Sequence, residues 1–312
     1  MKGDIIWYNE DMKKIDVVII GGGIAGMTAA IYVRRANKSV VVFEKNIYGG
    51  QIVETYAVEN WPGEISISGA DLSRKVEQQA KEFGVKFCDE EVLSVRKNGE
   101  REIAVETDEG EYYASSLIIA VGAEERKLGL PGEAEFAGRG ISYCATCDGA
   151  FYKDKEVVVV GGGNTALNDA LYLADIAKKV YLVHRRDTFR GDAVLVERLK
   201  AKENVEFILE SRPIEFLGDQ KLTGLKIAHI DGKEKVLEVP GVFMAVGKNP
   251  QTELVRELVD LDEKGYVVAG EDCHTSAEGI YVAGDCRTKE VRQLVTAASD
   301  GAVAATEACR NL

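Results

Sequence analysis

Cys144 and Cys147 are separated by two residues, and Asp148 follows directly after them. Two cysteines at this spacing can form a small-ring disulfide that cycles between oxidised and reduced states, with one thiolate stabilised by its surroundings. A carboxyl group beside such a pair can move protons during thiol exchange when burial raises its pKa. The pattern therefore predicts a redox-active centre made of Cys144, Cys147 and Asp148.

Other interpretations of these residues remain open from the sequence alone. A closed zinc site needs four ligands, but no second Cys-x-x-Cys motif and no histidine pair at suitable spacing occurs, so we expect no metal. The two thiols could instead be buried and unreactive, as cysteine often is in protein cores, and Asp148 could be a polar turn residue before Gly149. The other cysteines are too scattered for a disulfide scaffold: Cys88, Cys273, Cys286 and Cys309.

The chain contains an internal repeat that supplies the elements around the cysteine pair. Residues 16–32 align without gaps with residues 156–172, and the offset from Gly21 to Gly161 is 161 − 21 = 140 residues. Each copy has a continuous β-branched apolar run, a glycine-rich turn, a helical stretch and a second apolar run, which is typical of a βαβ unit in a parallel sheet. We expect strands at 17–20, 40–43, 157–160 and 180–183, and helices at about 25–35 and 166–178.

The two glycine-rich turns read Gly21-x-Gly23-x-x-Gly26 and Gly161-x-Gly163-x-x-Ala166. The first glycine permits a tight turn, the second lets the backbone approach a pyrophosphate, and the third small residue lets the helix pack on the strand. Phosphate then lies at the helix N-terminus, where free N–H groups attract anions. Because each turn follows an apolar strand and opens a helix, we favour dinucleotide binding over a plain tight turn. The neighbouring residues are expected to contribute: Ile24, Ala25, Asn164 and Thr165.

The residues at the end of the second strand differ between the two copies. Glu44 stands where a carboxylate can accept hydrogen bonds from a ribose hydroxyl and would repel a 2′-phosphate, and we expect Lys45 to belong to the same site. At the same point of the second copy, the segment 184–190 places three guanidinium groups where a 2′-phosphate would lie. A solvated basic turn is the alternative. The second site is predicted to prefer NADPH through four residues: His184, Arg185, Arg186 and Arg190.

The composition excludes some classes of partner. The 312-residue chain has 52 acidic and 39 basic side chains and a net charge of −13, with no basic tract. It lacks the positive surface that attracts phosphate backbones and anionic lipids, so we expect neither nucleic acid nor a membrane as partner. No apolar stretch of about 18 residues occurs, and the N-terminal residues lack the apolar centre of a signal peptide. We therefore expect a cytoplasmic protein. Its length also predicts two domains, since a domain usually has about 100–200 residues.

Taken together, these motifs resemble those of the flavoprotein disulfide oxidoreductases with two dinucleotide-binding domains. The resemblance is to the bacterial-type low-molecular-weight thioredoxin reductases, over about residues 15–310. Besides the motifs above, it rests on Gly49-Gly-Gln-Ile, Val58-Glu-Asn-Trp-Pro-Gly63, Gly279-Ile-Tyr-Val-Ala-Gly-Asp-Cys286 and Arg292-Gln293. Two features depart from the family. Asn168-Asp169 replaces the usual two glutamates in the second helix, and the first residues, including Trp7 and Tyr8, extend beyond the common start.

The resemblance implies an α/β fold of two Rossmann-like domains, the second inserted into the first. It implies FAD in the first domain, with Glu44 at the adenosine ribose and a further set of residues around the flavin and its phosphates: Gly50, Gln51, Asn60, Gly284, Asp285, Arg292 and Gln293. It also implies that Cys147 faces the flavin, Cys144 attacks the disulfide of the partner, and Asp148 acts as acid and base. The implied donor is NADPH, the implied acceptor is thioredoxin or a similar small protein disulfide, and the implied assembly is a homodimer.

Alternatives to this function remain open. Within enzymes, the flavoprotein could take electrons from ferredoxin or serve another small protein disulfide. Outside enzymes, the chain could be a binding module that senses nucleotides and redox state.

The residues that resemble flavin contacts come from both ends of the chain, so we predict a discontinuous first domain. The FAD-binding domain is expected to comprise residues 1–124 and 250–312, with a helix at about 293–309, and the NADPH-binding domain residues 125–249. The expected crossovers, 122–126 and 247–250, are glycine-marked and polar. Because the cysteine pair and the NADPH site share one domain but must both reach one flavin, we predict a rotation of that domain about the crossovers.

Overall fold

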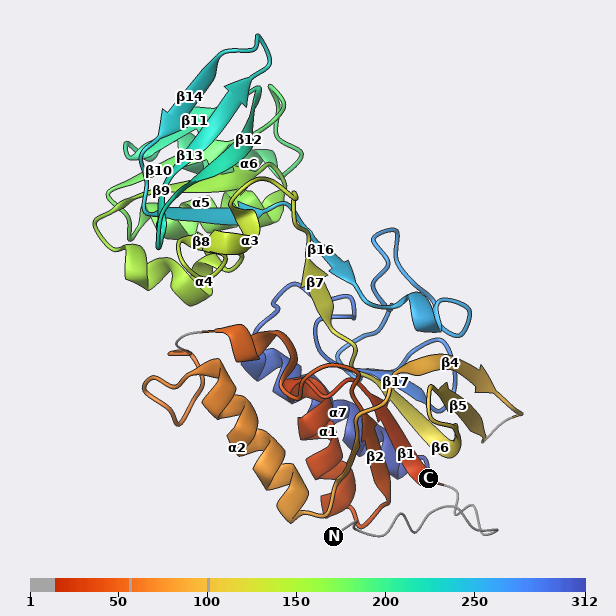
Figure 1. Ribbon diagram of the computed structural model, residues 1–312. Helices are drawn as coiled ribbons and strands as arrows, with labels where there is room; N and C mark the ends of the chain where they lie inside the picture. The colour runs from red at the N-terminus through yellow and green to blue at the C-terminus, as the bar shows by residue number, and fades with distance from the viewer. Residues whose placement is uncertain (1–14, 56–57, 100–101) are drawn as a thin grey trace. The chain divides into compact units, whose positions relative to one another are not determined.

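The computed structural model describes residues 15–55, 58–99 and 102–312. They form two compact units, of which the first ends at Glu124 and resumes at Asn249, and the second comprises Glu125–Lys248 (Figure 1). The N-terminal extension with Trp7 and Tyr8 lies outside the described residues. No helix in the described ranges is both long and apolar enough to span a bilayer.

A seven-stranded sheet organises the first unit. Five strands run parallel in the order β3-β2-β1-β6-β17, and β4 and β5 continue from β6 as an antiparallel meander. The first half of β6 pairs with β5 and its second half with β17, so one long strand joins both parts of the sheet. The strands are β1 (Ile15–Ile20), β2 (Val40–Phe43), β3 (Lys86–Cys88), β4 (Val92–Lys97), β5 (Ile103–Thr107), β6 (Glu111–Ile119) and β17 (Ile280–Val282).

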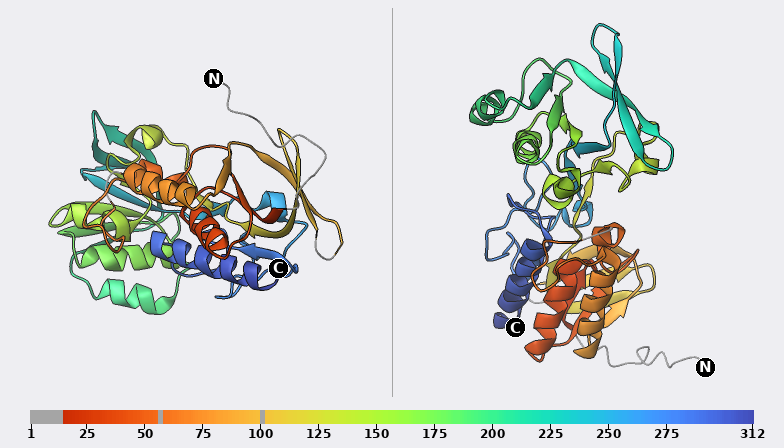
Figure 2. Two further views of the ribbon diagram at one scale, coloured as in Figure 1. Left: turned by 90° about the horizontal axis from the view of Figure 1, so that it is seen from below. Right: turned by 90° about the vertical axis from the view of Figure 1, so that its left-hand side faces the viewer.

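Helices cover one face of this sheet. In two views, α1 (Ile24–Arg35) lies beside both α2 (Gly69–Glu82) and α7 (Leu294–Arg310) (Figures 1 and 2). Val17 and Ile19 of β1 pack against α1 and α7, whereas Val18 and Ile20 pack into a second core on the opposite face. The strand is therefore buried on both faces, as its continuous apolar run predicts. Two short 3₁₀ helices complete the unit: η1 (Gly50–Glu54) and η3 (Glu253–Val255).

The second unit has a five-stranded parallel sheet in the order β11-β10-β9-β15-β8. Val157 and Val159 of β9 pack against α5, while Val158 and Val160 pack with residues of a separate antiparallel sheet, β12-β13-β14. The strands are β8 (Ile141–Ser142), β9 (Glu156–Gly161), β10 (Lys179–Val183), β11 (Val205–Ile208), β12 (Ser211–Gly218), β13 (Leu222–His229), β14 (Glu234–Leu237) and β15 (Gly241–Ala245). The helices are α3 (Glu133–Phe136), α4 (Ala145–Asp148), η2 (Gly149–Tyr152), α5 (Asn164–Ala174) and α6 (Ala193–Lys200).

The strand order repeats between the units. The order β3-β2-β1-β6 in the first matches β11-β10-β9-β15 in the second, and in each unit a helix follows the central strand. All four strands expected from the repeat are present as β1, β2, β9 and β10. The predicted α/β fold of two Rossmann-like units is therefore confirmed.

The helix after β9 is shorter at its end than expected. α5 begins at Asn164 and ends at Ala174, instead of covering 166–178. At this end of the helix the Ala177 N–H donates to the Leu173 carbonyl (2.7 Å), and the Asn204 amide donates to the carbonyls of Ala174 (2.9 Å) and Ala177 (3.2 Å). These bonds satisfy carbonyl groups that a helix end leaves unpaired, and a contact from a distant residue is not visible in the local sequence.

The two segments that connect the units pair with each other. Strands β7 (Ala123–Glu125) and β16 (Lys248–Pro250) form a two-stranded ribbon. The Arg126 N–H donates to the Gly247 carbonyl (3.0 Å), and Lys248 Nζ lies 2.7 Å from the Glu125 carboxylate. The ribbon lies at the positions expected for the crossovers, while the nucleotide that each unit binds stays a prediction.

Candidate active site

Cys144 and Cys147 are joined as a disulfide at the start of α4, with their Cα atoms 5.3 Å apart. Cys144 is the N-cap of this short helix, and the Asp148 N–H donates to its carbonyl (3.1 Å). Within the described residues, no group of three or more histidine, cysteine or acidic side chains is arranged to hold a metal ion. The pair thus has the oxidised form that a cycling dithiol requires.

Asp148 is the last residue of α4 and follows Cys147 directly in the chain. Burial raises the pKa of its carboxyl group, and a hydrogen bond from Ser142 Oγ (2.6 Å) partly offsets that rise. The same Ser142 hydroxyl accepts the Cys144 N–H (3.1 Å), so one buried serine connects the acid to the cysteine. A carboxyl group with a raised pKa can hold and release a proton closer to neutral pH. Ser142 is not among the residues predicted from the sequence, where its only signal is its place two residues before Cys144.

The first glycine-rich turn fits a bound pyrophosphate. Gly21 has a φ of 106°, and a Cβ there would lie 2.3 Å from the Ala120 carbonyl oxygen. A Cβ on Gly26 would lie 1.9 Å from the Gly21 carbonyl, so only glycine lets α1 pack this closely on the turn. Gly23 is the N-cap of α1, with Ile24 and Ala25 in the first helical turn, and it provides no side-chain cap for the N–H groups. These N–H groups form the kind of site that binds phosphate.

Glu44 is fixed beside this turn at the end of β2. Its Oε2 accepts the Gly22 N–H (2.8 Å) and its Oε1 accepts the Asn46 N–H (2.9 Å). Each oxygen keeps a lone pair free for a ribose hydroxyl. The exposed Lys45 pairs with Glu91 (3.2 Å), and its contribution to a nucleotide site stays a prediction.

Four of the other residues predicted for the flavin are brought together in two pairs, one of which joins distant segments of the chain. Asn60 Nδ2 donates to Gln293 Oε1 (3.0 Å) across 233 residues of sequence. Arg292 Nε donates to the Asp285 carbonyl (3.3 Å), and its guanidinium lies over the Tyr266 ring. Two further predicted residues follow Gly49: Gln51 Nε2 donates to the Ala123 carbonyl, and Gly50, which opens η1, lies beside Gly23 of the first glycine-rich turn.

A buried ionic cluster holds the loop that carries Gly284 and Asp285. Asp300 of α7 accepts the Gly284 N–H (3.0 Å), two N–H groups of Arg287 (2.9 and 2.8 Å) and Lys289 Nζ (2.7 Å). Burial alone would raise the pKa of Asp300, but the bonds from Arg287 and Lys289 lower it. This cluster is not predicted from the sequence. Its only signal is a charged residue within the small apolar residues of the last helix.

The second turn has the same backbone features. A Cβ on Gly161 would lie 2.5 Å from the Ala245 carbonyl and 2.7 Å from the side chain of Ala166. Gly163 caps α5 without a side-chain hydrogen bond, Asn164 and Thr165 follow it, and a Cβ on Gly163 would meet no atom within 4 Å. The turn therefore leaves open space and free N–H groups for a phosphate.

A basic segment follows β10 and reaches this second turn. His184 is buried against Gly162. Its pKa is lowered mainly by burial, and the positive charges of Arg190, Arg185 and Arg186 lower it further. The Arg190 N–H donates to the Gly162 carbonyl (2.8 Å), which brings Arg190 to the turn, and Arg185 and Arg186 are exposed just after β10. Asn164 is held by two hydrogen bonds with Asp192. The three arginines thus belong to one short segment, whose last residue is hydrogen-bonded to the turn.

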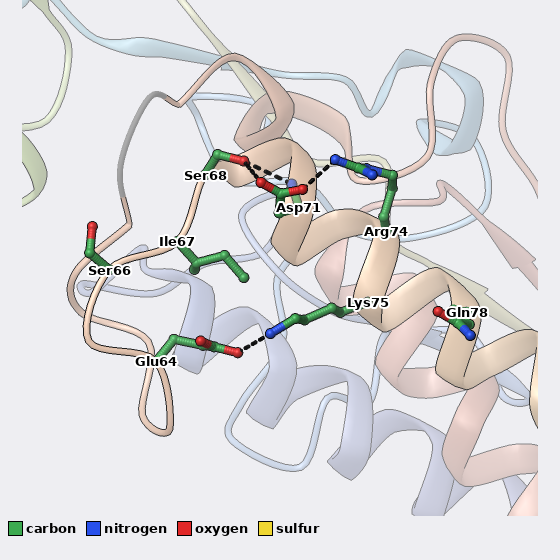
Figure 3. A pocket seen from close by; sticks show the side chains of 8 residues that line it. All are labelled: Glu64, Ser66, Ile67, Ser68, Asp71, Arg74, Lys75 and Gln78. Atoms are coloured by element: carbon green, nitrogen blue, oxygen red, sulfur yellow. Dashed lines mark hydrogen bonds and ion pairs between the residues drawn. The ribbon is translucent and has the colours of Figure 1, made fainter.

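An open depression at the start of α2 is a weaker candidate (Figure 3). Ser68 caps α2 by accepting the Asp71 N–H, Asp71 pairs with Arg74, and Glu64 pairs with Lys75. Its charged groups therefore already have partners, and the depression contains none of the predicted cofactor residues.

Comparison with known proteins agrees with this arrangement. Thioredoxin reductases from Listeria monocytogenes and Bacillus subtilis are 45% and 43% identical to the chain, covering 95% and 94% of it and 93% of each relative. A crystal structure of thioredoxin reductase from Streptococcus pyogenes matches with a TM-score of 0.91 and 39% identity, over 96% of this chain and 99% of that chain. These likenesses confirm the predicted family. Residues 15–302 match the pyridine nucleotide-disulphide oxidoreductases, and the chain belongs to that family.

Proposed function

We propose that this protein is a thioredoxin-disulfide reductase that passes electrons from NADPH through FAD and the Cys144–Cys147 disulfide to thioredoxin. The observation that carries the proposal is the disulfide next to a half-buried carboxyl group of raised pKa. Its support from outside the chain is the similarity to relatives named thioredoxin reductase over 95% of the sequence.

The residues of the first unit fit FAD, which supplies two-electron transfer between a nicotinamide and a disulfide. In this proposal the α1 N-terminus with Gly21 and Gly23 binds the pyrophosphate, and Glu44 binds the ribose. The remaining contacts come from Gly50, Gln51, Asn60, Gly284, Asp285, Arg292 and Gln293. In the second unit, the α5 N-terminus binds the pyrophosphate of NADPH, and Arg185, Arg186 and Arg190 bind its 2′-phosphate.

The cysteine chemistry follows from thiol–disulfide exchange. In the reduced pair, the Cys144 thiolate attacks one sulfur of the thioredoxin disulfide, and the bond between the two thioredoxin sulfurs breaks. Asp148 gives a proton to the thiolate that leaves. The Cys147 thiolate then attacks the Cys144 sulfur, which restores the Cys144–Cys147 disulfide and releases the second thioredoxin thiolate. Thioredoxin has gained two electrons, which NADPH replaces in the enzyme by way of the flavin.

A homodimer in the cytoplasm is part of the same proposal. Cysteines that cycle between thiol and disulfide are suited to a reducing compartment. Light scattering on the eluting protein should give about twice the chain mass of 34.0 kDa, and a monomer would contradict the proposed assembly.

The test begins with the colour of the purified protein. It should be yellow, its flavin absorbance should bleach on addition of NADPH, and it should reduce thioredoxin in the presence of a thiol reporter. Cys147→Ser should abolish thioredoxin reduction but leave bleaching by NADPH, while Cys309→Ser, a free cysteine elsewhere, should behave as the wild type. Colourless protein that takes up no flavin would contradict the function. Bleaching by reduced ferredoxin but not by NADPH would contradict the donor.

A further inference from the structure

Tyr48 packs on the glycine-rich turn of the first unit, and no step above uses it. A Cβ placed on Gly22 would lie 2.7 Å from Tyr48 Cδ1 and 3.0 Å from Glu44 Cβ. Gly22 is buried, and Tyr48 is half-buried. The aromatic ring therefore touches the backbone of the turn that is proposed to receive the FAD phosphates.

The ring is held in this position from its far end. The Tyr48 hydroxyl donates to Asp89 Oδ1, directly after β3, and the ring packs edge-on against Phe87 with centroids 4.9 Å apart. Burial is the main cause that raises the pKa of Tyr48, and the bond to Asp89 raises it further. The hydroxyl therefore stays protonated and donates. The next residue, Gly49, donates its N–H to the Gly22 carbonyl (2.9 Å). Tyr48 thus links the turn to the carboxyl end of β3, the edge where parallel sheets bind ligands.

The orientation of Glu44 depends on the same glycine. Its Oε2 is held by the Gly22 N–H at 2.8 Å, so a shift of Gly22 would turn the carboxylate away from the ribose. Tyr48 lies against Gly22 and blocks that shift. The ring and the ribose-binding carboxylate are therefore coupled through one residue.

The second copy of the repeat shows a ring at the matching place. There His184, at the position equivalent to Glu44, covers Gly162: a Cβ on Gly162 would lie 2.1 Å from His184 Cε1. In the first copy that position must carry a carboxylate to bind the ribose. The ring is supplied instead by Tyr48, four residues later in the chain.

We propose that Tyr48, held by Asp89, is a positioning residue for the adenosine half of FAD, and that it keeps Gly22 and Glu44 in the geometry that binds the ribose. This inference rests on the proposed function, because it assumes FAD in the first unit. It predicts a loss specific to ligands that have the adenosine half.

The test measures flavin release from the holoenzyme after dilution, by the rise in flavin fluorescence. Tyr48→Ala should release FAD about tenfold faster, because such a change corresponds to the loss of roughly one hydrogen bond between Glu44 and the ribose. Tyr48→Phe, which keeps the ring but loses the bond to Asp89, should lie between Tyr48→Ala and the wild type, and Asp89→Ala should resemble Tyr48→Phe. The matched control is Tyr32→Ala, which removes an exposed tyrosine of α1 and should release FAD at the wild-type rate.

Binding of FMN to the apoprotein separates positioning from general damage, because FMN lacks the adenosine half. FMN affinity should be equal in the wild type and Tyr48→Ala. Equal losses for FAD and FMN, or FAD release from Tyr48→Ala within about twofold of the wild type, would overturn the inference. A Tyr48→Phe variant that releases FAD as slowly as the wild type would overturn the role of the hydrogen bond to Asp89. Wild-type protein that takes up no flavin would instead overturn the proposed function.

Discussion

Asp148 combines two opposing influences at one carboxyl group. Burial disfavours its charged form and raises its pKa, whereas the hydrogen bond from Ser142 favours the charged form. The protonated carboxyl is the form that can give a proton to a leaving thiolate. Activity should therefore fall on the alkaline side, as the pH rises through the pKa of Asp148.

Replacing Asp148 by Asn should remove the proton donor and keep the size of the side chain. We expect thioredoxin turnover to fall by about 100-fold and to lose its alkaline limb, while NADPH still bleaches the flavin. Ser142→Ala removes the bond that favours the carboxylate, so the pKa should rise further and the alkaline limb should move to higher pH. Steady-state rates across the pH range check both variants. An Asn variant with the wild-type pH profile would exclude Asp148 as the acid.

The arginines after β10 should decide between the two nicotinamide coenzymes. The double change Arg185→Ala and Arg186→Ala removes charge-assisted bonds to a 2′-phosphate, and should raise the KM for NADPH by about 10–100-fold. The KM for NADH should change little, because NADH lacks that phosphate. Arg198→Ala, an exposed arginine of α6, is the control. Equal effects on both coenzymes would show that the arginines do not bind the 2′-phosphate.

At the scale of elements, α7 and the loop before it depend on one buried carboxylate. The side chains of Arg287, Lys289 and Asp300 are at most 6% exposed, so removing Asp300 would leave two cations buried without their counter-charge. The loop they hold carries Gly284 and Asp285, which are proposed to contact FAD. Loss of the carboxylate should thus affect stability and flavin binding together.

Asp300→Ala should lower the free energy of unfolding by about 3–5 kcal/mol, the usual cost of breaking a buried ion pair. Because the folded pKa of Asp300 is lowered, its stabilising effect is present above its ordinary pKa and is lost as the pH falls through the folded value. Urea unfolding at neutral pH measures the loss. The control is Glu271→Ala, whose 94% exposed carboxylate lies 3.4 Å from Arg287 and should contribute little. Equal losses from both variants would contradict this account of the cluster.

The sequence predicted the elements that depend on local patterns. The central strands could be predicted because a continuous run of β-branched residues is typical of a strand that is buried on both faces. Fixed spacing in the sequence also made three motifs predictable, because their function requires it: the glycine-rich turns, Glu44 and the cysteine pair. The end of α5 was missed, because Asn204 helps to terminate it from 27 residues beyond Ala177. Ser142 and Asp300 were missed for the same reason: their role exists only once the chain brings their partners to them.

At the scale of the whole molecule, a titratable group of α5 interacts with the two connections between the units. Asp169 of α5 interacts with Glu125 of β7 and Lys248 of β16, the two strands of the connecting ribbon. Burial is the main cause that raises the pKa of Asp169 to about 7. The negative charge of Glu125 adds to the rise, and the positive charge of Lys248 opposes it. Asp169 is also one of the two residues that depart from the family pattern in this helix. The rotation about the ribbon stays a prediction, and the charge of Asp169 at neutral pH has a measurable consequence for stability.

The raised pKa of Asp169 means that the folded chain binds more protons than the unfolded chain between pH 3.8 and about 7. The free energy of unfolding should therefore fall as the pH rises through this window and stay level above it. Asp169→Asn cannot ionise, so it should gain stability relative to the wild type as the pH rises, reaching a few kcal/mol at about pH 8 since each pKa unit corresponds to about 1.4 kcal/mol. Urea unfolding at about pH 5 and pH 8 measures the difference, with the exposed Asp175→Asn at the end of the same helix as control. If Asp169→Asn lost as much stability as the wild type between these two pH values, Asp169 would be charged throughout and would not link protons to stability beside the ribbon.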